Sequence, residues 1–322
     1  EHLREYARGD QLEQITDESR LRREFPYLSE SVRQLVHIRR AGPMDVYSMG
    51  SFLLGQARKA GVRFENGQVE NIHKDSGRFH LQVRTPGGEI SLSSRQLVLT
   101  AGPMNPALAS MLGVQLPVQS FLQRKFIIPD PENVIPRDMP YTIFADPQHL
   151  DWTEEERDLF AEDPEYHHLL DQFPGGLHIK PESGNGIKLG WAINREPENP
   201  QWEPADNDEF PNIVLKGASR FIPGLAAYFE RMPTPVVQFA GYYTRTPENW
   251  PIIGPLEQCD GLFTIAALSG FGTMAACGAG ELLSQWMTGE DTPDYARHFH
   301  PKRYRDPDIV AEIAAIESDG QL

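Results

Sequence analysis

The chain has 322 residues, 39% of them apolar and 24% charged, which allows two globular domains or one large α/β unit. Its net charge of −16 argues against nucleic acid and anionic membrane surfaces as partners, because both would repel it, and no apolar run approaches the roughly 20 residues of a membrane span. Cys259 and Cys277 are the only cysteines, which fits neither a disulfide framework nor a zinc site and favours the cytoplasm.

The N-terminal part is expected to contain one helix and several short strands. The residues from Glu1 are charged and resemble the middle of a helix, and we expect the numbered chain to begin inside a longer protein. A helix is predicted for residues 45–60, with Asp45 as its cap and Gly61 at its end. Strands are predicted from apolar residues and their alternation at 62–64, 79–83, 90–92 and 97–101, with a hairpin loop at 85–88.

The middle of the chain mixes strand and helix signals. Residues 116–128 favour a strand, and residues 177–181 and 187–191 favour a β-pair. Thr153, which precedes three glutamates, predicts the start of a surface helix, and a further helix is predicted for residues 209–221.

The most informative segments lie near the C-terminus. Residues 240–254 contain the run Tyr-Thr-Arg-Thr-Pro, and residues 261–274 contain an apolar strand, a glycine turn and the start of a helix that runs to Met287. Such a turn directs backbone N–H groups and the positive end of the helix dipole at an electron-rich group. A strand, turn and helix that merely pack together are the alternative.

Together these segments resemble the C-terminal signature of the superfamily of FAD-dependent D-amino acid and sarcosine oxidases. The resemblance extends over residues 24–299. It implies a mixed α/β fold, with an FAD/NAD(P)-binding-like domain that is N-terminally incomplete and an inserted mixed or antiparallel β-sheet substrate domain. The FAD-binding domain is expected at 1–115 and 241–322, and the substrate-binding domain at 116–240.

The resemblance also assigns cofactor-binding residues. Val69 would lend its backbone to the adenine end of FAD, and Ala101 and Gly102 would pass near its ribose and pyrophosphate. Gly241 stands where sarcosine oxidase has the cysteine that tethers its flavin, so non-covalent FAD is expected. The turn at the flavin ring comprises Gly270, Phe271, Gly272, Thr273 and Met274.

Lys188 and Tyr243 match positions of the family beside the flavin and the substrate, and Arg245, two residues beyond Tyr243, is a third catalytic candidate. Lys188 would lie beside the flavin and help dioxygen to react, because a fixed ammonium stabilises superoxide as it forms. Tyr243 would border the substrate, and Arg245 can pair with a carboxylate. The alternatives are an exposed strand lysine, a core tyrosine and a surface arginine. Met274 replaces a lysine that binds the substrate carboxylate, and Ala192 replaces a nearby histidine, so a pocket for sarcosine itself is not expected.

One expected motif is missing. The family binds the FAD pyrophosphate with a Gly-x-Gly-x-x-Gly turn, and the sequence contains none. Either that segment is separate from this chain, which would make the missing N-terminal segment a partner, or the chain cannot hold FAD alone. No metal site is expected, because the histidine pairs at 167–168 and 298–300 lack further ligands at suitable spacing.

The expected function is FAD-dependent oxidation of the C–N bond of a small amine or amino acid to an imine. Dioxygen, with hydrogen peroxide as product, or a protein acceptor would reoxidise the flavin. A dehydrogenase that avoids oxygen remains open. The alternative is a non-catalytic assembly or scaffold protein that retains the flavoprotein fold.

Overall fold

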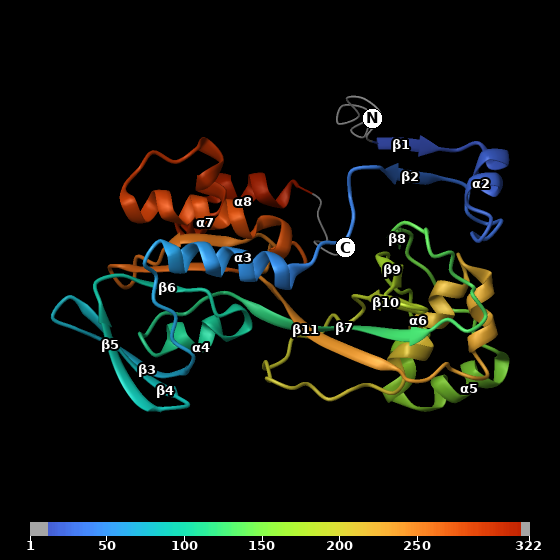
Figure 1. Ribbon diagram of the computed structural model, residues 1–322, viewed down its shortest axis with the longest axis horizontal. Coiled ribbons are helices and arrows are strands. Elements are labelled where there is room, and N and C mark those ends of the chain that lie inside the picture. Colours follow the sequence, from blue (N-terminus) through green and yellow to red (C-terminus); the bar gives the residue numbers. More distant parts are fainter. Residues whose placement is uncertain (1–11, 317–322) are drawn as a thin grey trace.

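The computed structural model describes residues 12–316, so the helix expected from Glu1 lies outside the described residues. The described chain forms two lobes (Figure 1). Two long antiparallel strands, β7 (Gln119–Pro129) and β11 (Val237–Arg245), reach from one lobe into the other. No helix among residues 12–316 has the length and apolar character of a membrane span.

One lobe is built on a five-stranded antiparallel sheet in the order β11-β7-β10-β9-β8. Because side chains alternate across a strand, the two faces of the sheet differ. The back face carries Ile187, Leu189 and Trp191, which are buried in the main core. The front face carries Lys188 and Gly190. The other strands and helices of this lobe are β8 (Thr142–Phe144), β9 (Leu177–Glu182), β10 (Gly186–Trp191), α5 (Glu154–Glu162), η2 (Pro164–Leu169), α6 (Phe210–Ser219) and η3 (Pro223–Tyr228).

The start of the described chain belongs to the same core. Strands β1 (Leu12–Ile15) and β2 (Leu35–Ile38) pair, and α2 (Glu18–Glu24) lies between them in the sequence. Ile15 and Leu21 are buried in the core of the five-stranded sheet lobe. The division at 1–115, 116–240 and 241–322 stays a proposal; the 240/241 boundary falls inside β11.

The other lobe contains two three-stranded sheets, ordered β3-β4-β5 and β12-β13-β6. In the second sheet β13 runs parallel to β6, and α7 packs on β12 and β13. The 14 residues of α3 include none that is buried. The elements of this lobe are α3 (Val46–Lys59), β3 (Gln68–Asp75), β4 (Arg78–Thr85), β5 (Gly88–Ser94), β6 (Leu97–Leu99), η1 (Gly102–Met104), α4 (Asn105–Ser110), β12 (Ile252–Pro255), β13 (Leu262–Ala266), α7 (Gly272–Thr288), η4 (Asp294–His298), η5 (Pro301–Arg305) and α8 (Pro307–Ala314).

Most predicted elements are confirmed, with clear local causes. The Asp45 side chain accepts hydrogen bonds from two backbone N–H groups of α3, and Thr153 forms a capping box at α5. Gly289 ends α7 with a φ of 74°. The strand predicted at 62–64 is wrong: these residues pair with no other strand, and β3 begins only at Gln68.

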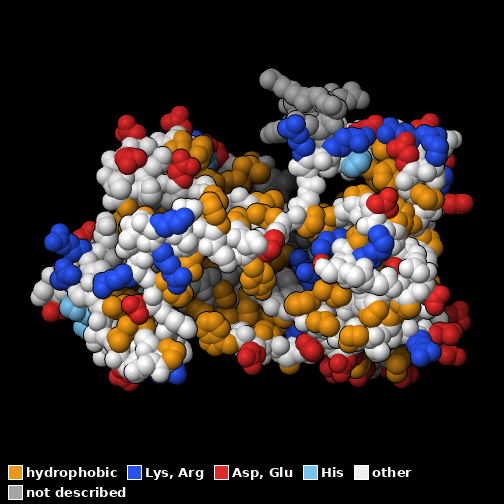
Figure 2. All heavy atoms as spheres, viewed as in Figure 1, with side chains coloured by type: hydrophobic (Ala, Val, Ile, Leu, Met, Phe, Trp, Pro, Cys, Tyr) orange, Lys and Arg blue, Asp and Glu red, His pale blue; other side chains and the backbone are white. Residues whose placement is uncertain are grey.

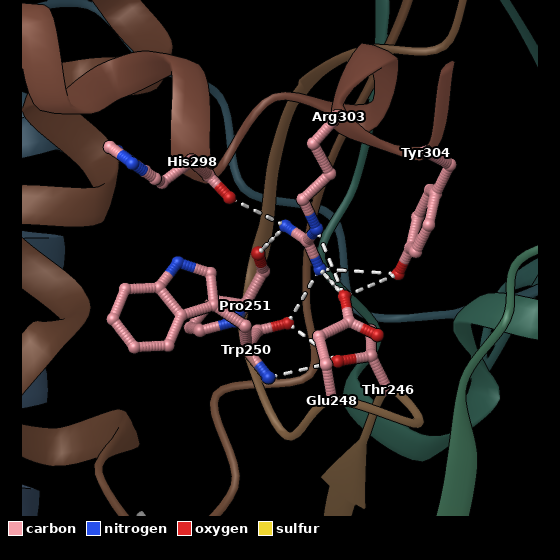
Figure 3. Close-up of polar contacts among 7 residues, drawn as sticks. All are labelled: Thr246, Glu248, Trp250, Pro251, His298, Arg303 and Tyr304. Atoms are coloured by element: carbon pink, nitrogen blue, oxygen red, sulfur yellow. Dashed lines mark hydrogen bonds and ion pairs between the residues drawn. The ribbon is translucent and has the colours of Figure 1, made fainter. Parts of the chain in front are cut away.

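A buried arginine ties the C-terminal region to the turn after β11 (Figure 3). Arg303 is 1% exposed and forms an ion pair with Glu248. Its guanidinium also donates to the backbone oxygens of Trp250, Pro251 and His298, with distances of 2.9 Å to the first and last. The arginine therefore holds together a turn that would otherwise leave carbonyl groups without partners.

Candidate functional site

The turn between β13 and α7 has a strained backbone. Ala267 and Ser269 have φ angles of 59° and 49°, which cost side-chain-bearing residues about 1–3 kcal/mol each. The Ser269 N–H donates to the oxygen of Thr244 at 3.0 Å, which fixes the turn against β11. Since strain of this kind persists only where surrounding contacts enforce it, the turn is a candidate site.

Tyr243 lies directly against this turn. A Cβ atom at Gly270 would lie 3.1 Å from Cε2 and 3.4 Å from Oη of Tyr243, a tight contact, so glycine favours the close approach of the ring. Gly272 differs, because a Cβ there would meet its nearest neighbour, Leu268, at 3.7 Å, an ordinary contact. The structure thus brings Tyr243 and Gly270 together, while no neighbour among the described residues requires glycine at 272.

The start of α7 fits an electron-rich ring such as that of a flavin. No side chain caps the helix, and its first turn contains no acidic residue. Thr273 is exposed, and the Met274 side chain is 64% exposed, so the first turn is accessible. Unpaired N–H groups and the helix dipole at such an end stabilise negative charge.

Ala101 and Gly102 reach the same edge of the sheet as this turn. They follow β6, whose parallel neighbour β13 leads into the turn, so the carboxyl ends of both strands lie side by side. Asn105, fully buried and not singled out by the sequence, connects the two: it accepts from the Ala101 N–H at 2.6 Å and donates to the Ile265 oxygen at 3.0 Å. Val69 lies in the other small sheet and packs on a core cluster that includes Leu99 of β6 and Leu262 of β13.

The three predicted catalytic residues share the front face of the five-stranded sheet, but they are spread along it. Lys188 pairs with Ile127 across β7, whereas Arg245 pairs with Gln119. Eight residues of an extended strand span about 27 Å, so the two cations are too far apart to bind one carboxylate together. The Lys188 Nζ lies 5.3 Å from the centre of the Phe239 ring, and the Arg245 guanidinium lies 5.3 Å from that of Phe121.

The same face brings together residues that the sequence analysis missed. Lys125 and His178 both pair with Gly190, from the strands on either side of it. Burial and the charge of Lys188 lower the pKa of Lys125, and burial raises the pKa of Tyr243. Alternation along β7 could have placed Lys125 on one face, but only the strand pairing puts it beside Lys188.

His178 is held neutral by its surroundings. Its ring is 3% exposed, and burial together with the charge of Lys125 lowers its pKa to about 4. Nδ1 lies 3.0 Å from the Gly176 oxygen and must donate to it, which leaves Nε2 as an acceptor. Nε2 is buried and has no hydrogen-bond partner among residues 12–316.

Acidification should therefore destabilise the fold through His178. Between its ordinary pKa of 6.5 and its folded value of about 4, the unfolded chain binds the proton and the native chain does not. Stability is thus complete above this window and should fall by up to about 3 kcal/mol as the pH drops through it. Urea unfolding across the window, with His178→Gln as a non-titrating reference, measures the effect. An equal acid sensitivity of both proteins would contradict it.

Figure 2 shows that the molecule is hollowed between the two lobes, where apolar side chains gather and basic side chains lie at the margin. A pocket of about 260 Å³ adjoins the front face and is lined by Tyr141, Lys180 and residues 41–43, among others. A larger cavity of about 600 Å³ is lined by none of the predicted site residues. The hollow, rather than the larger cavity, is therefore the candidate site.

Comparisons with known proteins bear on the family and the fold. The family model described as FAD dependent oxidoreductase matches residues 1–286, and no curated protein matches the chain. L-Proline dehydrogenase from P. horikoshii is similar in structure, with 19% identity, a TM-score of 0.66, and coverage of 92% of this chain and 69% of its own. Glycine oxidase from Geobacillus kaustophilus has 18% identity and a TM-score of 0.65, and the match covers 91% of this chain and 67% of its own. Iminodiacetate oxidase from Chelativorans sp. BNC1 has 17% identity and a TM-score of 0.63, with coverage of 90% of this chain and 67% of its own. The predicted mixed α/β fold is confirmed.

Proposed function

The chain belongs to the FAD dependent oxidoreductase family, and on that premise we propose that it oxidises the C–N bond of a small amine or amino acid to an imine. The observation that carries the proposal is the uncapped start of α7, with the Tyr243 ring against Gly270. Bound FAD would accept a hydride equivalent, which carries both electrons of the oxidation, and the proton on nitrogen would leave to solvent. Residues 270–274 would hold its ring without a covalent bond, and Ala101, Gly102 and Val69 would bind the remainder.

The chain's own residues would position the substrate and supply charge. Tyr243 would border the substrate, and its phenol, which is protonated at neutral pH and whose pKa burial raises further, would donate a hydrogen bond. Arg245 would attract a carboxylate at one end of the front face, and Lys188 would hold a positive charge at the other. Dioxygen or a protein as electron acceptor, the absence of a nucleic-acid partner and a cytoplasmic location stay predictions.

Two measurements test this function. The purified protein, made from its complete reading frame, should show the visible absorbance of a flavin, and a candidate amine should bleach it without oxygen. Return of the colour in air indicates an oxidase, and its failure to return indicates a dehydrogenase. Absence of flavin, or no bleaching by any of a panel of amines and amino acids, would contradict the proposal and favour a scaffold protein.

We also propose a partner for an uncovered apolar face. Exposed apolar residues cluster on and after α3. A face of this kind marks a contact site. The β12-β13-β6 sheet ends at β6, and the backbone N–H and C=O groups on the outer side of an edge strand can pair with a further strand. The face comprises Val46, Tyr47, Phe52, Leu53, Val62 and Phe64.

The occupant that fits this face is a βαβ dinucleotide-binding unit, which would add a strand at β6 and supply the pyrophosphate site. The comparisons leave room for a unit of this size, because the chain spans only 69% and 67% of the length of the first two similar structures. Such a unit brings the Gly-x-Gly-x-x-Gly turn that this sequence lacks.

Substituting Phe52 should test that contact. The Phe52→Asp variant should bind FAD about tenfold or more weakly, because a buried phenylalanine contributes about 1.5–3 kcal/mol to an interface. Leu159→Asp is the matched control, since Leu159 on α5 is 59% exposed and Phe52 is 63% exposed. The dissociation constant of FAD is measured by flavin fluorescence on the protein from the complete reading frame. Equal affinity of both variants for FAD would mean that no dinucleotide-binding unit contacts this face.

A further inference from the structure

The front face of the five-stranded sheet is positively charged in a chain whose net charge is −16. Strand register places Lys125, Lys180, Lys188 and Arg245 on this face. Glu182 is the only carboxylate at the paired front-face positions of the five described strands. Because charged groups of one sign gathered in a concave site attract the opposite charge, this face selects for an anion.

Two of these cations are left without a carboxylate. Lys180 is neutralised by Glu182, whose Oε2 lies 2.8 Å from its Nζ. Within residues 12–316, neither Lys125 nor Lys188 has a carboxylate at ion-pair distance. Both are half-buried. Two partly desolvated ammonium groups on adjacent strands destabilise each other, and an anion between them would relieve this repulsion.

Gly190 makes the room for this pair. A Cβ atom there would lie 2.5 Å from Nε2 of His178 and 2.7 Å from Cγ of Lys125, so both side chains fold over the glycine. The neutral His178 ring beneath Lys125 adds no competing charge, and its buried Nε2 offers an acceptor without a partner in the described chain. Contacts with these neighbours therefore restrict the aliphatic part of the Lys125 side chain.

We propose, on the basis of the amine oxidation proposed above, that the substrate is a net-anionic amine bearing two carboxylates and that Lys125 is its specificity-determining residue. A simple amine is a cation at neutral pH and is repelled by both ammonium groups. The carboxylate of a zwitterionic amino acid is attracted by one lysine, but its ammonium group is repelled by the other. An amine with two carboxylates offers one negative group for each of Lys125 and Lys188.

The test is the binding of two acids that cannot be oxidised as amines, the dicarboxylate succinate and the monocarboxylate propionate. Both are titrated into the flavin-containing protein by calorimetry. Succinate should bind the wild type more tightly than propionate, and Lys125→Met should weaken succinate about tenfold or more. Lys216→Met is the matched control and should change little, because Lys216 is also half-buried but lies on α6, which packs on the back face, and is already paired with Glu156. Lys125→Arg should keep much of the affinity, which separates loss of charge from loss of folding.

The outcomes separate this inference from the proposed function. If the two acids bind equally, or Lys125→Met and Lys216→Met have the same effect, the dicarboxylate site is overturned, whether or not amines reduce the flavin. If succinate binding depends on Lys125 but no amine reduces the flavin, the site is supported and the amine oxidation fails.

Discussion

Replacing Lys188 with methionine should slow the reaction of the reduced protein with dioxygen by about 100-fold or more. A preorganised charge at a site of developing negative charge is worth about that factor, and methionine keeps the length of the stem while removing the ammonium. Lys188 has this character because it is half-buried on β10 and held over the Phe239 ring. At saturating substrate, reduction should change only a few-fold, since the substrate supplies its own electrons.

Stopped-flow measurement of the two half-reactions checks this result. The protein is first reduced anaerobically by substrate and then mixed with buffer containing dioxygen. Lys216→Met provides the control, because Lys216 is also half-buried but lies on α6 and is already paired with Glu156. Equal slowing of both half-reactions would assign Lys188 to general positioning, and no slowing of either would remove it from the site.

Arg303→Met should destabilise the protein by about 3–5 kcal/mol. Removing one partner of a buried ion pair leaves the other charge uncompensated, and Glu248, whose side chain is only 16% exposed, would lose its guanidinium partner. Carbonyl groups at Trp250, Pro251 and His298 would lose a donor at the same time (Figure 3). Because the turn that includes Glu248 follows β11, FAD affinity should fall together with stability.

Denaturant unfolding measures the stability change, and an exposed arginine gives the control. Arg305 pairs with Glu257 but its side chain is 72% exposed, so Arg305→Met should cost no more than about 1 kcal/mol. Adding Glu248→Gln to Arg303→Met should recover part of the loss, because the unpaired charge is then gone. A similar cost for Arg303→Met and Arg305→Met would show that the buried network does not stabilise the turn.

Local signals in the sequence were sufficient for much of the secondary structure. Asp45 and Thr153 predicted helix starts because capping needs only the residue and the next turn of backbone. The hairpin at 85–88 and the end of α7 at Gly289 were likewise predicted from adjacent residues. The strand at 62–64 failed because a strand needs a pairing partner, and the residues there have none in the described chain.

The sequence alone determined the family, the kind of cofactor and the glycine turn before α7, because a motif carries these in contiguous residues. Only the tertiary structure decided which side chains share a surface. Lys125, His178 and Lys188 come from three strands, and the register of those strands sets them on one face. The tight contact that favours glycine at position 270 likewise comes from Tyr243, 27 residues earlier in the chain. Strand pairing and close packing bring together residues that are distant in the sequence, and a local sequence pattern cannot predict either.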